Sequence, residues 1–132
     1  MPPERQRVLT GTIWEERAGY CRALRAGSMI FVSGTLPTDD EGNVVHANAP
    51  YLQTLAALEK IEGALRELGA SRRDVVRTRI FLTSLKNEHE VGKAHLEFFR
   101  DVTPCCTMVE VAGLASPMAL VEVELEALVD DD

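Results

Sequence analysis

The spacing of hydrophobic positions changes along the chain, and each spacing predicts one kind of element. Between residues 49 and 68, leucine and isoleucine recur every three or four positions, with charged side chains between them. This spacing is typical of an amphipathic helix, and Gly69 suits its C-terminal cap. A second apolar stripe predicts another helix, which begins after Asn87 and whose end Pro104 marks. Its members are Val91, Ala94, His95, Phe98 and Val102.

Alternating apolar and polar positions predict strands on either side of these helices. Residues 20–26 and 29–32 flank the turn residues Gly27 and Ser28, which is the pattern of a hairpin. Residues 75–83, 107–111 and 121–129 alternate in the same way. One more short strand is an option near residues 7–11. The expected order is β-β-α-β-α-β-β, an α+β fold with one mixed sheet.

The two faces of this sheet are expected to differ in polarity. Two helices can cover only one face, and the apolar positions belong beneath them. These positions are Val76, Ile80, Leu82, Val109, Val111, Val121, Val123 and Leu125. The other face then carries Arg77, Arg79, Glu110, Glu122, Glu124 and Glu126. Such a face is either solvated or an oligomer interface in which opposite charges pair across strands. Phe81 and Met108 among the charges favour the interface.

Composition excludes several classes of function. A net charge of −7 and only 5% aromatic residues argue against binding to nucleic acid or to an anionic membrane. No apolar stretch approaches the ~20 residues of a membrane span. Three cysteines, two of them adjacent, do not form a disulfide framework and indicate reduced thiols in a cytoplasmic protein.

We expect one domain over residues 1–132, with 1–18 as an N-terminal arm or short strand.

The three histidines show no ligand spacing with the cysteines, so we expect no metal. No phosphate-binding loop or G-x-S-x-G motif is present, and no cofactor is expected. The arginines that could hold an anion are Arg22, Arg25, Arg77 and Arg79.

Five stretches together resemble the RidA/YjgF (reactive-intermediate deaminase) family. They are Gly19–Ala23, Ile30–Pro37, Gln53–Leu58, Asp74–Thr78 leading into Phe81 and Leu82, and Phe98-Phe99 followed by Pro104, Val109–Val111 and Leu120–Val123. The resemblance implies a chorismate-mutase-like fold and a homotrimer. In such a trimer the sheets form a barrel, the helices lie outside, and a small molecule binds in clefts between subunits.

The resemblance also implies a set of site residues. Glu122 falls on the glutamate that positions water, and Tyr20 on the cleft tyrosine. Ser33, Gly34 and Thr35 match the segment whose backbone contacts the ligand, and Cys106 and Thr107 are further candidate ligand-binding residues. Apart from the resemblance, Arg79 is the favoured cation among the four arginines.

Cys106 stands where the deaminases of this family place the arginine that binds the substrate carboxylate. A neutral thiol cannot form the bidentate ion pair, so the chain resembles the arginine-lacking subfamilies rather than a standard 2-imino acid deaminase. The expected function is binding of a small metabolite, with hydrolysis of an imine, enamine or related C–N bond. A non-catalytic or regulatory trimer is the alternative, and a ribonuclease or translation inhibitor is less favoured because of the acidic charge.

Overall fold

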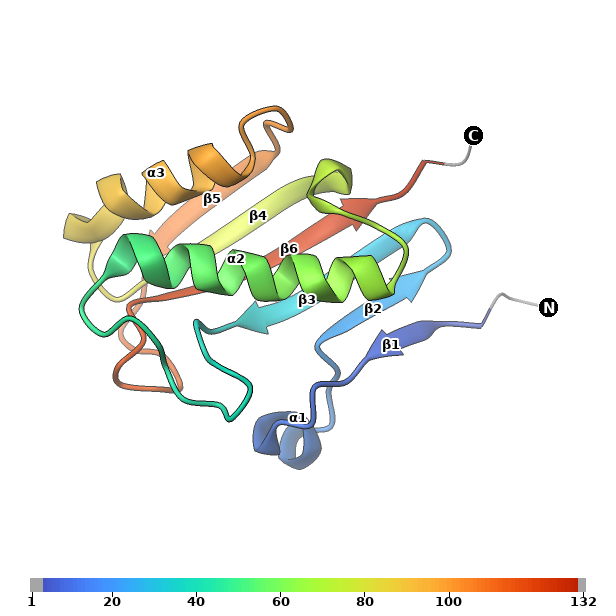
Figure 1. Cartoon of the computed structure of the whole chain (residues 1–132), viewed down its shortest axis with the longest axis horizontal. Helices are drawn as coiled ribbons and strands as arrows, with labels where there is room; N and C mark the ends of the chain where they lie inside the picture. The colour runs from blue at the N-terminus through green and yellow to red at the C-terminus, as the bar shows by residue number, and fades with distance from the viewer. Residues whose placement is uncertain (1–3, 131–132) are drawn as a thin grey trace.

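One six-stranded sheet runs through the computed structural model, which describes residues 4–130. Its strands lie in the order β1-β2-β3-β6-β4-β5, with β4 and β5 parallel and the other neighbours antiparallel. Figure 1 shows α2 and α3 side by side across one face of this sheet. The strands are β1 (Gln6–Val8), β2 (Ala23–Ala26), β3 (Met29–Thr35), β4 (Val75–Leu82), β5 (Cys105–Glu110) and β6 (Val121–Leu128). The helices are α1 (Ile13–Ala18), α2 (Pro50–Glu67) and α3 (Glu88–Phe98), with single 3₁₀ turns at Arg72–Asp74 and Leu85–Asn87.

This architecture confirms the predicted mixed sheet with two main helices on one face. The prediction missed α1, because a helix of six residues is too short to show periodicity. Its end signals are local: the Thr12 side chain accepts a hydrogen bond from the Glu15 amide, and Gly19 adopts a left-handed conformation at φ 73°. As a result, α1 lies at the end of the sheet near the start of β2 (Figure 1).

The core lies between α2, α3 and the sheet. Leu58, Ile61 and Leu65 of α2 are almost completely buried, as are Ile30 and Val123 on the strands below. Burying each such side chain contributes about 1.5–3 kcal/mol, so the apolar stripe of α2 determines which side of the helix faces the sheet. No helix within residues 4–130 has the length and apolar character needed to cross a membrane.

The predicted side-chain orientation is wrong at the start of β4. Val75 is buried and Val76 is 42% exposed, because the register with β6 shifts between Val75 and Arg77. A bulge of this kind adds one residue to a strand and exchanges its faces. Beyond the bulge, Thr78, Ile80 and Leu82 face the helices as predicted.

The orientation predicted for β5 is also wrong. Met108 lies beside Ile80 in the parallel register and packs against the core, so Cys106, Met108 and Glu110 occupy the helix side of the strand. Thr107 and Val109 lie on the other side. Alternation along a strand divides its residues between two faces but does not show which face packs against the core. In the edge strand β5, too few positions are buried for the sequence pattern to identify that face.

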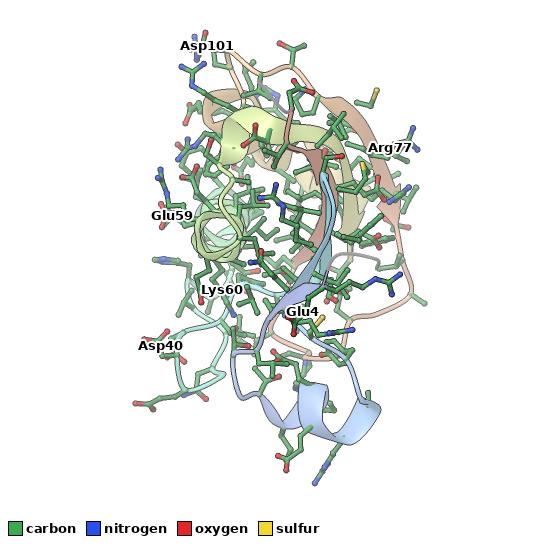
Figure 2. The ribbon with its side chains drawn as sticks, turned by 90° about the vertical axis from the view of Figure 1, so that its right-hand side faces the viewer. Glu4, Asp40, Glu59, Lys60, Arg77 and Asp101 are labelled. Atoms are coloured by element: carbon green, nitrogen blue, oxygen red, sulfur yellow. The ribbon has the colours of Figure 1, made fainter. Side chains whose placement is uncertain are left out.

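The sheet face away from the helices, called the open face below, carries paired charges. Arg79 Nη1 lies 2.8 Å from Glu126 Oε1 and 3.3 Å from Glu124 Oε2 on the neighbouring strand β6. In Figure 2, Arg77 points away from the helices on this side. Phe31, 46% exposed, adds apolar surface next to Glu126.

Gln53 is fully buried in α2 and connects two loops to the helix. Its amide nitrogen donates to the carbonyl oxygens of Met118, at 3.1 Å, and His46, at 3.3 Å. Its amide oxygen accepts from the Leu120 amide at 2.8 Å. One side chain therefore holds both the 36–49 segment and the 111–120 segment against the helix layer.

Replacing Gln53 with leucine is expected to lower the free energy of unfolding by about 2–4 kcal/mol. The change leaves three backbone groups without this partner, and each buried unsatisfied group is costly. Chemical denaturation of both proteins measures the difference. Glu59→Leu, which puts the same side chain on the outer side of α2 (Figure 2), is the control and is expected to change stability by less than about 0.5 kcal/mol. Equal effects of the two substitutions would contradict a specific role for the amide.

Candidate functional site

A cavity of about 320 Å³ opens where α1, the end of β3, α2 and the two loops held by Gln53 meet. Thr38 and Asp40 line it from the first loop, and Ala115 and Ser116 from the second. Trp14 of α1 lines another side and remains 51% exposed, so the ring lies at the rim. The cavity contains the polar side chains of Tyr20, Arg22, Lys60 and Glu122.

Gly34 and Glu122 are in close contact in the wall of the cavity. A Cβ atom added to Gly34 would lie 3.0 Å from Oε2 and Cδ of Glu122. Real Cβ atoms scarcely approach other heavy atoms so closely, so any larger residue at position 34 would displace the carboxylate. The register between β3 and β6 also shifts between Val32 and Thr35, which frees Gly34 from the regular ladder.

Glu122 is half-buried, and this burial raises the pKa of its carboxyl group. The positive charge of Arg22 opposes the shift, while the negative charge of Glu124 adds to it. Glu122 is therefore easier to protonate near neutral pH than an exposed glutamate. A carboxyl group of this kind can exchange protons with a ligand.

Arg22 is only 7% exposed and supports the Gly34 backbone. Its Nη2 donates to the Gly34 carbonyl oxygen at 2.8 Å. The guanidinium carbon lies 5.7 Å from the centre of the Tyr20 ring, within the range of a cation–π contact. These contacts join the start of β2 to the end of β3 beside the cavity.

Lys60 reaches the cavity from α2. In Figure 2 it lies on the side of the helix next to the loop that carries Asp40, whereas Glu59 points outward. Its Nζ donates to Thr38 Oγ1. Burial lowers the pKa of the Lys60 ammonium group, and repulsion from Arg22 lowers it further, while Asp40 acts in the opposite direction.

Only three of the predicted site residues line this cavity: Tyr20, Gly34 and Glu122. Ser33 and Thr35 flank Gly34, but their hydroxyl groups donate to the carbonyl oxygens of Cys21 and Ser33. Arg79 is on the open face, paired with glutamates. Cys106 and Thr107 are on β5, which β4 separates from β6, so one chain does not bring them to Glu122.

Sequence reasoning missed Lys60 as part of the site. Lys60 occupies the polar side of a predicted helix, where a lysine is ordinarily solvated, and nothing in the sequence distinguishes it from its neighbours. Arg22 was one of four candidate cations, and the structure places that one at the cavity.

The strand order, the two helices on one face and the position of the cavity define a YjgF-like α+β protein. The structure matches the crystal structure of a Mycobacterium tuberculosis member of the YjgF/YER057c/UK114 family with a TM-score of 0.87. The two chains are 39% identical, and the match covers 96% of this chain and all of that one.

The Endoribonuclease L-PSP family model matches residues 12–129, and the chain belongs to this RidA/YjgF/L-PSP family. It is 37% identical over 123 residues to an uncharacterized protein of Streptomyces coelicolor, covering 92% of this chain and 90% of that protein. It is also 35% identical over 106 residues to the 3-aminoacrylate deaminase RutC of Acinetobacter baylyi, covering 80% and 83% of the two chains.

We expect Glu122→Gln to raise the free energy of unfolding at pH 7. Because the folded-state pKa of Glu122 is raised, ionising it costs the folded state stability. The cost of ionising Glu122 is fully present above the pKa of Glu122 in the folded protein, and it is absent below its pKa in the unfolded chain, about 4.3. The extra stability of Glu122→Gln therefore disappears as the pH falls. Thermal unfolding between pH 4 and pH 8 measures it.

Glu59→Gln removes the same charge from an exposed position on α2 and serves as the control. If Glu122→Gln were instead less stable than the wild type at pH 7, the attraction of Arg22 for the Glu122 carboxylate would outweigh the effect of burial. The pKa of Glu122 would then not be raised.

Proposed function

We propose that this protein binds a small imine or enamine beside Glu122 and hydrolyses its C–N bond. The observation that carries the proposal is the half-buried Glu122 carboxyl group, which has a raised pKa and lies in the wall of a cavity against Gly34. Hydrolysis of an imine needs one group that first donates and later accepts a proton, and such a group works best when its pKa lies near the working pH.

In the proposed reaction, protonated Glu122 donates its proton to the imine nitrogen, or to the β-carbon of an enamine, which gives an iminium ion. A water molecule attacks the iminium carbon while the Glu122 carboxylate takes up a proton from it. The carbinolamine then collapses to a carbonyl compound and ammonia. The net change is addition of one water and release of one ammonia, and no oxidant or reductant is needed.

The named activity of one relative supports this class of substrate. The Acinetobacter baylyi protein is a 3-aminoacrylate deaminase, and 3-aminoacrylate carries its amino group on a carbon–carbon double bond. Its carboxylate is one bond further from the C–N carbon than the carboxylate of a 2-imino acid. An enamine of this type therefore belongs among the substrates to be tested here.

Cys106 argues against efficient hydrolysis of 2-imino acids. We propose that the chain belongs to the arginine-lacking members of its family. Losing a charge-assisted bidentate contact costs about 1.5–3 kcal/mol, or about ten- to a hundredfold in rate. The proposed hydrolysis therefore concerns imines and enamines whose binding does not need a cation at position 106.

We also propose that the protein is a homotrimer with its clefts between subunits. The open face combines the Arg79 ion pairs with exposed apolar surface at Phe31, which suits an interface. Within one chain, Cys106 and Thr107 lie away from Glu122. In a trimer, β5 of a neighbouring subunit would supply them to the cleft.

Turnover tests the proposed reaction. The full chain is incubated with 3-aminoacrylate, with a set of neutral imines and with 2-iminobutanoate, and ammonia release is followed. We expect hydrolysis of at least one of the first two types, weak hydrolysis of 2-iminobutanoate, and a loss of about 10²–10⁴-fold in Glu122→Gln. Glu59→Gln, which removes the same charge from the outer side of α2 (Figure 2), is expected to retain most of the activity.

Robust hydrolysis of 2-iminobutanoate would contradict the role assigned to Cys106. Saturable binding without turnover on every substrate would favour a non-catalytic binding protein. Equal activity of wild type and Glu122→Gln would remove Glu122 from the mechanism.

Light scattering tests the trimer. We expect a mass three times the 14.6 kDa of one chain, and a smaller mass for Phe31→Glu, which puts an unpaired charge beside Glu126 on the open face. Glu59→Lys, on the outer side of α2, is the control and is expected to remain trimeric. A mass of 14.6 kDa for the wild type would contradict the proposal.

A further inference from the structure

We propose that Arg22 and Lys60 form a subsite for a carboxylate group of the ligand within the cavity. The inference rests on the proposed function for the identity of the substrate, which would be an enamine or imine carrying a carboxylate. The subsite itself is a binding property and can be tested without turnover.

The first observation is the environment of Arg22. The residue is more than nine-tenths buried, yet within residues 4–130 its side chain makes a single hydrogen bond, from Nη2 to the Gly34 carbonyl oxygen. Its Nε is buried and has no hydrogen-bond partner among the described residues. A buried guanidinium group ordinarily has a carboxylate beside it, because a buried charge is costly unless it is paired. An anionic ligand in the cavity would provide that pairing.

The second observation is that Lys60, a second cation, lines the same cavity. Its only hydrogen bond within residues 4–130 goes to the neutral Thr38 hydroxyl. Burial and the nearby Arg22 charge both disfavour its protonated form. Two cations that repel one another in a partly buried space are stabilised together when one anion lies between them.

Nearby acidic groups do not neutralise this pair. Within the part of the chain that the structure describes, no carboxylate lies within 4.0 Å of Arg22 or Lys60. Asp40 and Glu41 line the cavity from an exposed loop, where solvent screens their charge. Glu15 already accepts hydrogen bonds from the Thr10 amide and hydroxyl groups. Within residues 4–130, Arg22 and Lys60 thus form no salt bridge, and Glu122 and Glu15 interact with Arg22 only at longer range, although the protein has a net charge of −7.

The position of Arg22 also orients the ligand. Arg22 lines the same cavity as Lys60 and Glu122, and its charge acts on the pKa of both. A carboxylate held between Arg22 and Lys60 would leave the C–N bond of the same molecule pointing toward Glu122. Such a subsite lies on other elements of the fold than position 106, so it would hold a carboxylate in a different place from the arginine of the 2-imino acid deaminases.

Matched ligands of equal size test the subsite. The full chain is titrated with propanoate and with its neutral amide, propanamide, at constant pH and ionic strength, and binding is followed by amide chemical shifts in NMR spectra. We expect propanoate to bind at least about tenfold more tightly. Lys60→Met and Arg22→Gln are each expected to weaken propanoate binding by about ten- to a hundredfold and to leave propanamide unchanged. Arg22→Lys should recover part of the loss.

The control is Arg66→Gln, which removes a positive charge from an exposed position on the same helix as Lys60. It is expected to leave propanoate affinity unchanged. If Arg22→Gln loses its native spectrum, Lys60→Met alone decides the question. Equal affinity for propanoate and propanamide, or an equal loss in Arg66→Gln and Lys60→Met, would overturn the subsite.

The two proposals fail separately. Carboxylate-selective binding without hydrolysis of any tested substrate supports the subsite and contradicts the proposed function. Hydrolysis without carboxylate selectivity supports the proposed function and overturns the subsite.

Discussion

The amide of Gln53 is the interaction on which the site depends. It satisfies three backbone groups from two loops that lie far apart in the sequence, and it does so from a fully buried position on α2. Both loops line the cavity. Since loops carry few core contacts of their own, a buried polar connection to the rigid helix layer gives the cavity a defined shape. The cost is that any loss of the amide leaves unsatisfied groups in the interior.

Around that framework, the cavity concentrates charges that burial makes unfavourable. Burial favours the neutral forms of both Glu122 and Lys60, and the Arg22 guanidinium lines the same cavity. Gly34 makes the arrangement possible because no side chain occupies the space in front of the carboxylate. Burying these charged groups lowers the stability of the ligand-free protein. A ligand that accepts a proton from Glu122 and places an anion beside Arg22 and Lys60 would restore that stability. This combination links the proposed acid–base chemistry to the proposed carboxylate subsite.

The family resemblance implied clefts between subunits, and one chain alone does not bring together all the residues that it suggested. The positions that matched the family motif are divided between two regions: Tyr20, Gly34 and Glu122 line the cavity, whereas Cys106 and Thr107 lie on the edge strand β5. Arg79, the favoured cation from the sequence, pairs with glutamates on the open face. Arg22 and Lys60 are the cations that line the cavity instead. The division is what a site shared between subunits would require, and the proposed trimer accounts for it.

The sequence by itself determined the mixed sheet, the two long helices and the polarity of β6, because strong periodicity over many residues leaves little choice of structure. It also determined the family, through motifs spread along the chain. Only the tertiary structure decided the bulge at Val76, the orientation of Cys106 on β5 and the place of Lys60 in the cavity. Each depends on a neighbouring element: the register of β6, the position of α3 over an edge strand, and the loop that carries Thr38. Periodicity is a property of one segment, whereas these features arise where segments distant in sequence meet.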